Sequence, residues 1–211
     1  MKVNEIFVSI QGESTYAGRP CLFIRAAECN LRCTYCDTQY AYTDGTAMAV
    51  SELLEIVRNC GVNLVEITGG EPLLQNDVPE LVRQLLEEDY TVLVETNGSV
   101  ALDLIDSQAV RIMDIKCPSS EMSDRNDFSN IQKLQPTDEV KFVITTYEDY
   151  CWASSIIDTY QLDKKVTILL SPVLEKLPPK QLAEWILRDK KNVRLQLQLH
   201  KIIWGPDARG V

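Results

Sequence analysis

Apolar positions along this chain follow two periods, one typical of strands and one typical of helices. Short runs rich in β-branched and aromatic residues, bounded by Gly, Pro, Asn or Asp, predict strands. Runs with apolar residues three and four positions apart predict amphipathic helices. The predicted strands are residues 3–10, 21–27, 64–68, 91–95, 110–115, 139–145, 165–170 and 193–199. The predicted helices are residues 50–60, 77–88, 148–160 and 178–190.

Strands that alternate with helices favour βαβ crossovers and a parallel sheet. Most predicted strands end in a polar or glycine-rich segment, and in (β/α) barrels this edge is where functional sites are built. A complete barrel takes about 250 residues, whereas this chain has 211 and some of its connections are too short for full helices. We therefore expect an α/β fold, a partial and open barrel of parallel strands with some shortened or missing helices. No linker or repeat divides the chain, so residues 1–211 are expected to form one domain.

Composition narrows the possible partners. Apolar residues make up 45% and charged residues 25% of the chain, as in ordinary globular proteins. The formal charge of −10 disfavours broad electrostatic binding to nucleic acid. We expect no membrane partner, because no apolar run approaches spanning length and the first residues lack a signal-peptide core. Seven cysteines without framework spacing favour a reduced, cytoplasmic protein.

Three cysteines near the N-terminus, Cys29, Cys33 and Cys36, form the pattern C-x3-C-x2-C. Thiolates are the ligands that zinc, copper(I) and iron–sulfur clusters prefer, so three of them can hold three corners of a four-cornered centre. A fourth protein ligand would make a closed zinc site, and Cys21 or the only histidine, His200, is a candidate for it. A [4Fe–4S] cluster with one open iron is the other possibility. The cysteines alone favour the open cluster.

A second motif carries a resemblance. Thr68-Gly69-Gly70-Glu71-Pro72 follows a predicted strand about 35 residues after the cysteines. Together the two motifs resemble the radical S-adenosylmethionine (SAM) superfamily, in which three cysteines hold the cluster and SAM chelates its fourth iron. The resemblance implies a radical-SAM-type barrel, with backbone carbonyls and a carboxylate of the glycine turn offered to the SAM amino group.

Further blocks narrow the resemblance to the 7-carboxy-7-deazaguanine synthase family. They occur in the family's order over nearly the whole chain: Gln11-Gly12-Glu13, Gly18-Arg19-Pro20, Arg25, Cys36-Asp37-Thr38, Glu95-Thr96-Asn97-Gly98 and Gln198-Leu199-His200-Lys201. The implied activity is that of a radical SAM carbon–nitrogen lyase in 7-deazapurine and queuosine biosynthesis. The family converts 6-carboxy-5,6,7,8-tetrahydropterin to 7-carboxy-7-deazaguanine by a ring contraction that releases ammonia, and it regenerates SAM.

The resemblance also implies roles for individual residues, with a [4Fe–4S] cluster, SAM and Mg²⁺ as cofactors. Thr38 matches a Mg²⁺ ligand, a role that suits its oxygen atom. The planar fork of Arg25 suits a substrate carboxylate. Glu13 either binds substrate or stabilises its loop. The implied substrate-binding residues are Ile10, Gln11, Gly12, Glu13, Arg25, Thr68 and Pro206. The implied SAM-binding residues are Gly70, Glu71, Glu95, Asn97, Asp114, Ile115, Lys116, Ser171, Pro172, Val173 and Leu174.

The same residues also admit structural interpretations. Without the resemblance, Thr38 reads as a turn residue, Asp37 as a helix cap and Gly69-Gly70 as a tight turn. His200 is equally suited to a structural and to a site role. The four cysteines outside the motif, Cys21, Cys60, Cys117 and Cys151, are expected to be buried small apolar residues.

The C-terminus departs from the family pattern. Some family members stop soon after the His-Lys block, and their last residue reaches the substrate. Here the chain continues from Trp204 to Val211, so either Pro206 or the extension 207–211 takes that role. Arg209 is a candidate second cation for the pterin carboxylate.

Two other functions fit parts of the pattern. A glycyl-radical-enzyme activase shares the cysteine loop and the SAM chemistry but acts on a protein partner. A non-enzymatic zinc module would need only the thiolates. The resemblance implies a homodimer, to which Trp152, Trp185 and Trp204 are candidate contributors, and an electron donor such as flavodoxin.

Overall fold

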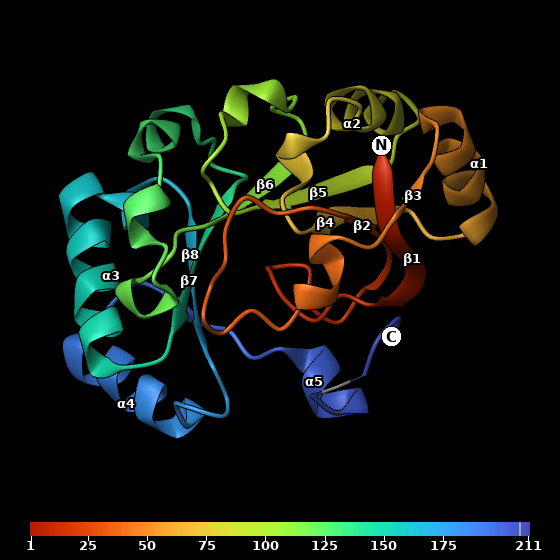
Figure 1. The fold of residues 1–211 in the computed structure, drawn as a ribbon. Coiled ribbons are helices and arrows are strands. Elements are labelled where there is room, and N and C mark those ends of the chain that lie inside the picture. The colour runs from red at the N-terminus through yellow and green to blue at the C-terminus, as the bar shows by residue number, and fades with distance from the viewer. Residues whose placement is uncertain (207) are drawn as a thin grey trace.

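The computed structural model describes residues 1–206 and 208–211, and its centre is one curved sheet (Figure 1). The strands run in the order β3-β1-β2-β4-β5-β6-β7-β8-β9, so the sheet is open between its two edges. From β2 to β9 neighbouring strands pair in parallel. The strands are β1 (Lys2–Ile10), β2 (Pro20–Ala26), β3 (Thr46–Ala47), β4 (Leu64–Gly69), β5 (Thr91–Thr96), β6 (Val110–Asp114), β7 (Glu139–Ile144), β8 (Thr167–Pro172) and β9 (Arg194–Leu195).

Helices cover the outside of this sheet, as Figure 1 shows for α1 to α4. They are α1 (Val50–Cys60), α2 (Val78–Glu87), α3 (Tyr147–Tyr160), α4 (Pro179–Asp189) and the short α5 (Leu199–Trp204). After β5 and after β6 the chain forms only 3₁₀ turns where a complete barrel would have helices. The prediction of an open barrel with missing helices is therefore confirmed. Among the helices described, none has the length and apolar character needed to cross a bilayer.

One strand runs against the parallel sheet that the sequence predicts. β1 pairs antiparallel with β2 and, at its start, with β3. Residues 11–19 connect β1 to β2, and a parallel crossover needs a dozen or more residues, so the chain can only turn back on itself. The antiparallel β1 thus closes one edge of the sheet.

Side chains alternate between the two faces of the sheet along each strand. The outer face is apolar, whereas the inner face has an apolar part and a polar part. On β4, Val65 and Ile67 join the main apolar core under the helices. Leu64 points the other way and joins Phe23 and Leu93 in a smaller apolar cluster inside the curve. Further along the same inner face, nearer the carboxyl ends of the strands, the side chains become polar. The apolar cluster is therefore a floor, and the polar positions above it form a site.

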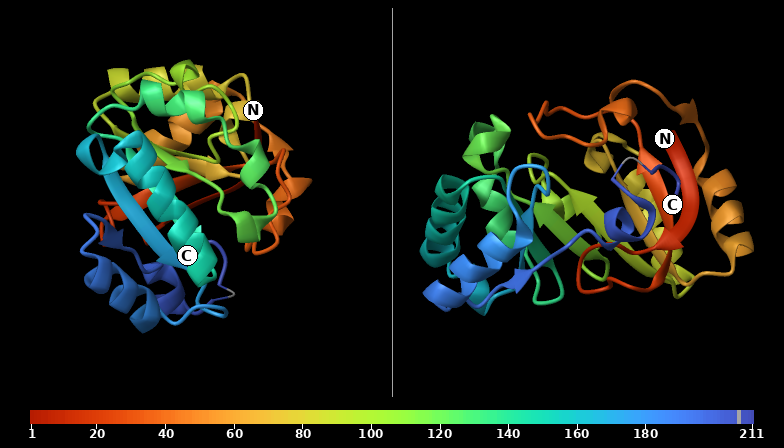
Figure 2. Two further views of the ribbon diagram at one scale, coloured as in Figure 1. Left: turned by 90° about the vertical axis from the view of Figure 1, so that its left-hand side faces the viewer. Right: turned by 90° about the horizontal axis from the view of Figure 1, so that it is seen from below.

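The last predicted strand, residues 193–199, is wrong in its extent. Only Arg194–Leu195 pair with β8, after which the chain leaves the sheet and crosses the open gap towards β1 (Figure 2). The backbone N–H of Leu199 donates to the carbonyl of Gly12 at 3.0 Å, which anchors the crossing segment. Helix α5 follows it. The sequence analysis did not predict α5, because six residues are too few for a helical period to be distinguished from that of a strand.

Candidate functional site

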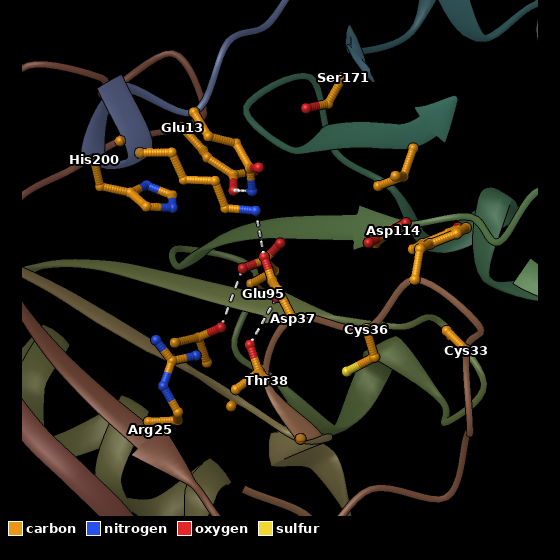
Figure 3. A pocket seen from close by; sticks show the side chains of 18 of the residues that line it. Glu13, Arg25, Cys33, Cys36, Asp37, Thr38, Glu95, Asp114, Ser171 and His200 are labelled. Carbon is orange, nitrogen blue, oxygen red and sulfur yellow. Dashed lines mark hydrogen bonds and ion pairs between the residues drawn. The ribbon is translucent and has the colours of Figure 1, made fainter. Parts of the chain in front are cut away.

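A cavity of about 630 Å³ opens at the carboxyl ends of the parallel strands (Figure 3). The cysteine loop, the inner faces of strands β1, β2 and β4 to β8, and the C-terminal segment all contribute to its lining. Every predicted substrate residue lines it: Ile10, Gln11, Gly12, Glu13, Arg25, Thr68 and Pro206. Thr38 and the three motif cysteines line it as well. The fold thus gathers residues that are up to 200 positions apart in the chain into one site.

The cysteine loop is held by one hydrogen bond within it and by one to the segment after β6. Cys36 N–H donates to the Cys33 carbonyl at 3.2 Å, and Thr34 N–H donates to the Ser120 carbonyl at 3.2 Å. Burial raises the pKa of the Cys29 and Cys33 thiols, and the nearby Lys116 ammonium opposes this rise. Thiols must ionise to bind metal, so the positive charge of Lys116 favours the liganded form.

The donor set of this loop fits a cluster with three thiolates. No group of three His, Cys, Asp or Glu side chains in residues 1–206 and 208–211 converges on a point where one ion would sit. A [4Fe–4S] cluster needs wider spacing than one zinc ion, because each sulfur binds a different iron. Asp114, on the opposite wall, has a buried Oδ1 without a hydrogen-bond partner among the described residues.

Cys21 is not a fourth ligand of this group. It is fully buried on β2 in the apolar floor, and its thiol donates to the Leu22 carbonyl at 3.5 Å. It lies four residues before Arg25 on the strand, which is roughly 13 Å at 3.3 Å per residue. Cys117 is also buried, as predicted, and Cys60 is partly buried. The prediction for Cys151 is wrong, because its side chain lies on the exposed side of α3.

The glycine turn after β4 brings the backbone close to the cysteine loop. A Cβ atom at Gly70 would overlap the carbonyl oxygen of Glu28, so only glycine fits there. Glu71 is fully buried and accepts hydrogen bonds from Leu73 N–H at 3.0 Å, Thr96 Oγ1 at 2.8 Å and Asn97 N–H at 2.7 Å. The Glu71 carboxylate therefore ties this turn to the end of β5.

The predicted SAM residues divide into those that line the cavity and those behind it. Lining residues are Gly70, Glu95, Asn97, Asp114, Lys116, Ser171, Pro172 and Val173. Glu71, Ile115 and Leu174 lie outside the lining. Ile115 is in the main apolar core. Lys116 Nζ donates to Asp114 Oδ2 at 2.7 Å, and this carboxylate keeps the pKa of Lys116 high even though burial alone would lower it.

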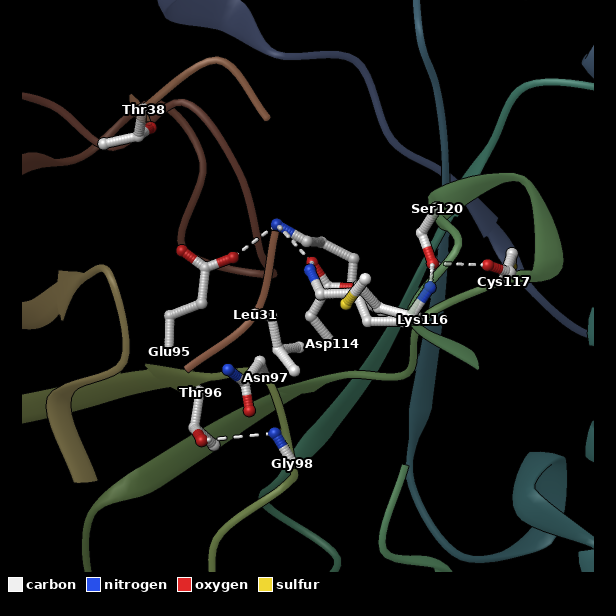
Figure 4. A network of polar contacts seen from close by, with 12 residues as sticks. Leu31, Thr38, Glu95, Thr96, Asn97, Gly98, Asp114, Lys116, Cys117 and Ser120 are labelled. Atoms are coloured by element: carbon white, nitrogen blue, oxygen red, sulfur yellow. Dashed lines mark hydrogen bonds and ion pairs between the residues drawn. The ribbon is translucent and has the colours of Figure 1, made fainter. Parts of the chain in front are cut away.

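A buried lysine that the sequence analysis missed binds three carboxylates of the cavity, two of which, Glu95 and Asp114, are labelled in Figure 4. Lys141 on β7 is 6% exposed, and its Nζ binds Glu13 Oε2 at 2.9 Å, the Glu95 carboxylate, and Asp114 Oδ2 at 3.8 Å. Burial alone would lower the pKa of Lys141, but the three carboxylates raise it well above its usual value. Lys141 therefore stays positively charged. Its signal in the sequence is a charged residue at an inward position of the apolar strand 139–145.

Arg25 lines the cavity and is held there by Glu5, which also binds Tyr40. Its Nε donates to Glu5 Oε1 at 2.7 Å, and Tyr40 OH donates to the same oxygen at 3.0 Å. The Arg209 guanidinium stacks over the Tyr40 ring, with 3.9 Å from Cζ to the ring centroid. Two guanidinium groups are therefore placed around one tyrosine at the mouth of the cavity.

Glu13 joins the C-terminal segment to the strands. Gln198 Nε2 donates to Glu13 Oε1 at 2.7 Å, and Gln196 Nε2 donates to Glu13 Oε2 at 2.9 Å. The His200 imidazole lies against Gly12, where a Cβ atom would overlap it. Burial lowers the pKa of His200, and Glu13 partly offsets this. The structure places His200 in the cavity wall, the position that the sequence left open.

Asp37 connects α5 to the cysteine loop. Lys201 Nζ donates to Asp37 Oδ2 at 2.7 Å, and Thr38 Oγ1 donates to Asp37 Oδ1 at 2.9 Å (Figure 3). Because the Thr38 proton is used on Asp37, the lone pairs of Thr38 are left to accept. This arrangement suits an oxygen ligand of a hard cation.

Comparisons with known proteins agree with this geometry. Residues 24–115 match the model of the radical SAM superfamily. A 7-carboxy-7-deazaguanine synthase from Chlorobaculum tepidum is 45% identical, over 100% of this chain and 97% of the relative. One from Koribacter versatilis is 39% identical over 100% of both chains.

Solved structures share the fold. The crystal structure of QueE from Escherichia coli superposes with a TM-score of 0.77 at 22% identity and covers 93% of each chain. The structure of Streptococcus suis SuiB bound to precursor peptide SuiA gives a TM-score of 0.60 at 15% identity, over 83% of this chain and 47% of SuiB. At these identities the likeness concerns the fold.

Proposed function

The chain belongs to the 7-carboxy-7-deazaguanine synthase family of the radical SAM superfamily, and we propose that it converts 6-carboxy-5,6,7,8-tetrahydropterin to 7-carboxy-7-deazaguanine. The reaction contracts the pterin ring and releases ammonia, which makes the enzyme a lyase of 7-deazapurine and queuosine biosynthesis. The observation that carries the proposal is the full-length similarity together with a single cavity that contains the three cysteines and Arg25.

Cys29, Cys33 and Cys36 hold a [4Fe–4S] cluster, and SAM binds beside it. When bound, these two groups supply the one-electron chemistry that starts a radical reaction. The residues for SAM are those of the predicted set that line the cavity, from Gly70 to Val173. The absence of a side chain at Gly70 lets the backbone approach a ligand closely.

The substrate is held by charge and by a polar floor. Arg25 pairs with the pterin carboxylate, because Glu5 holds the guanidinium through Nε and its fork faces the cavity. Gln11, Thr68 and Pro206 contact the ring, and Glu13 both contacts it and ties down the C-terminal segment. That segment also limits access of water to the site.

Thr38 is a ligand of a Mg²⁺ ion that the substrate carboxylate shares. Asp37 accepts the Thr38 proton at 2.9 Å and so orients its lone pairs. Arg209 is a second cation for the same carboxylate, so in this proposal the extension as well as Pro206 reaches the substrate. Asp207, within that extension, lies outside the described residues.

The protein acts as a homodimer in the cytoplasm, as one radical SAM domain over residues 1–211. None of its seven cysteines, all of them among the described residues, forms a disulfide in the structure, in keeping with a reducing compartment. Trp204 is 40% exposed and available to a dimer interface, whereas Trp152 and Trp185 pack against the core. An electron donor such as flavodoxin reduces the cluster.

Anaerobic reconstitution with iron and sulfide, followed by SAM, Mg²⁺ and the carboxytetrahydropterin, tests the function. The expected result is a brown protein that forms a product with the mass of 7-carboxy-7-deazaguanine and releases ammonia. A colourless protein that retains zinc, or a brown one that cleaves SAM without converting the pterin, would contradict the proposal. The second outcome would favour an activase of a glycyl-radical protein.

A further inference from the structure

Glu66 is a buried carboxyl group in the cavity that the roles described so far do not use. It lies on β4 between Leu64, which belongs to the apolar floor, and Thr68, which belongs to the polar site. Its register partners are Phe23 on β2 and Leu93 on β5, so two apolar side chains flank it. The residue is only 4% exposed, yet it lines the cavity.

Glu66 has no cation that pairs with it alone. No ion pair to Glu66 occurs in the part of the chain that the structure describes. The nearest cation, Lys141, is already bound by Glu13, Glu95 and Asp114. Burying an unpaired carboxylate costs several kcal/mol, which is why such groups neutralise instead.

The groups that raise the pKa of Glu66 outweigh those that lower it. Burial raises its pKa well above 4.5, and the negative charges of Glu95 and Glu13 raise it further. The Gln11 hydrogen bond and the Lys141 charge oppose this without reversing it. The Cys21 thiol, on the neighbouring strand, has a raised pKa and is neutral too.

The hydrogen bonds of Gln11 show how a neutral Glu66 would be oriented. Gln11 Nε2 donates to Glu66 Oε2, and Gln11 Oε1 accepts from Glu13 N–H at 2.9 Å. Both ends of the Gln11 amide are therefore used within the protein. With Oε2 as the accepting carbonyl oxygen, the proton of a neutral Glu66 belongs on Oε1, the oxygen that has no protein partner among the described residues.

We propose that Glu66 is held as a neutral carboxylic acid whose O–H donates a hydrogen bond to the bound pterin from the floor of the cavity. A donor at this position selects a ring carbonyl oxygen or an unprotonated ring nitrogen. An apolar side chain would fill the same space at less cost to stability, so the acid is retained for its hydrogen bond. The inference rests on the proposed substrate.

Infrared difference spectroscopy on the reconstituted enzyme with SAM tests the protonation directly. Wild type minus Glu66→Gln should show the carbonyl stretch of a protonated carboxylic acid at pH 7, and addition of the carboxytetrahydropterin should shift that band. A missing band, or a band that the pterin leaves unmoved, would overturn the inference. A band shift without turnover would count against the proposed reaction alone, and turnover without a shift against this inference alone.

Steady-state kinetics test the hydrogen bond. Glu66→Gln keeps an N–H donor, so its KM for the pterin should stay within about threefold of wild type, whereas Glu66→Leu removes the donor and should raise KM about tenfold. In wild type KM should rise at alkaline pH as Glu66 ionises, and in Glu66→Gln this rise should be absent. An unchanged KM in Glu66→Leu would refute the contact. If Glu66→Leu does not fold, the pH profile of Glu66→Gln decides.

Glu139→Gln is the matched control. Glu139 is also a buried acid on the inside of the sheet, and burial raises its pKa, but it binds Thr15 and lies outside the cavity lining. The same substitution there should leave both the KM for the pterin and its pH dependence unchanged. An effect equal to that of Glu66→Gln would mean that any buried acid of the barrel influences binding through stability, and the inference would fail.

Discussion

Neighbouring charged and aromatic groups fix the position and the protonation state of single residues in this site. Arg209 is a clear case, because its guanidinium lies 3.9 Å from the Tyr40 ring centroid while Tyr40 binds the Glu5 carboxylate that also holds Arg25. Aromatic stacking fixes a guanidinium without using its N–H donors. Arg209 lines the cavity, so its N–H donors remain available to a ligand there.

Replacing Arg209 by Ala should raise the KM for the pterin five- to twentyfold, with roughly unchanged kcat, since a rim charge contributes about 1–2 kcal/mol to binding. Arg209→Lys keeps the charge but loses the planar stacking, and it should fall between wild type and Ala. Initial rates measured over a range of pterin concentrations give KM and kcat for each variant. An unchanged KM in Arg209→Ala would remove Arg209 from the site.

The raised pKa of Glu66 also has a consequence for stability. The folded state keeps the Glu66 proton above pH 4.5, where the unfolded state has lost it, so ionisation linkage lowers the stability of wild type as pH rises from 4.5 towards the folded pKa. Glu66→Gln has no such loss. Its Tm should therefore exceed that of wild type more at pH 8 than at pH 5, in thermal melts followed by circular dichroism. A constant or shrinking difference would show that Glu66 is ionised in the fold.

At the scale of elements, most strands and helices could be predicted from local sequence patterns, whereas the contacts between segments far apart in the chain could not. Residues 64–68 and 139–145 were predicted as strands from their apolar runs, and β4 and β7 form there. The inward charges Glu66 and Lys141 could have been located from the same alternation. Their partners could not, because Glu13 and Lys141 are 128 positions apart and meet only across the open barrel. The same holds for residues 197–199, which lie beyond the last backbone hydrogen bond to β8, from Gln196 N–H to the Leu170 carbonyl, and are held by Gly12 and Glu13 instead.

The turn after β4 is the element on which the contact between sheet and cysteine loop depends. Gly70→Ala would force its Cβ into the Glu28 carbonyl, and backbone must move. We expect a loss of about 2 kcal/mol or more in the free energy of unfolding and a lower iron content after reconstitution. Gly61→Ala, at a positive φ in open space after α1, is the control: it strains the backbone without any overlap near the cysteine loop, so it should keep the iron content of wild type. Equal iron content in Gly70→Ala and wild type would show that the loop tolerates the displacement.

On the scale of the whole molecule, the barrel places its seven cysteines in distinct surroundings. Three share a loop at the carboxyl edge of the sheet, while Cys21 lies in the floor beneath and Cys117 in the core under the helices. The order of the strands enforces this separation, because β2 carries Cys21 near its start and delivers the loop at its end. Topology thus separates the thiols proposed to bind the cluster from those that pack in apolar surroundings.

Substituting Ala for single cysteines separates these two roles. Cys33→Ala should lose most of the iron and the brown colour while the protein stays folded, because its thiol is a proposed cluster ligand and is only partly buried. Cys21→Ala should keep the iron of wild type and lose about 1 kcal/mol of stability, because it removes a fully buried sulfur from an apolar cluster. Iron and sulfide assays with denaturant melts on both variants make the comparison. If Cys21→Ala lost its metal as Cys33→Ala does, four thiolates would be sharing one closed centre, and no iron would be left for SAM.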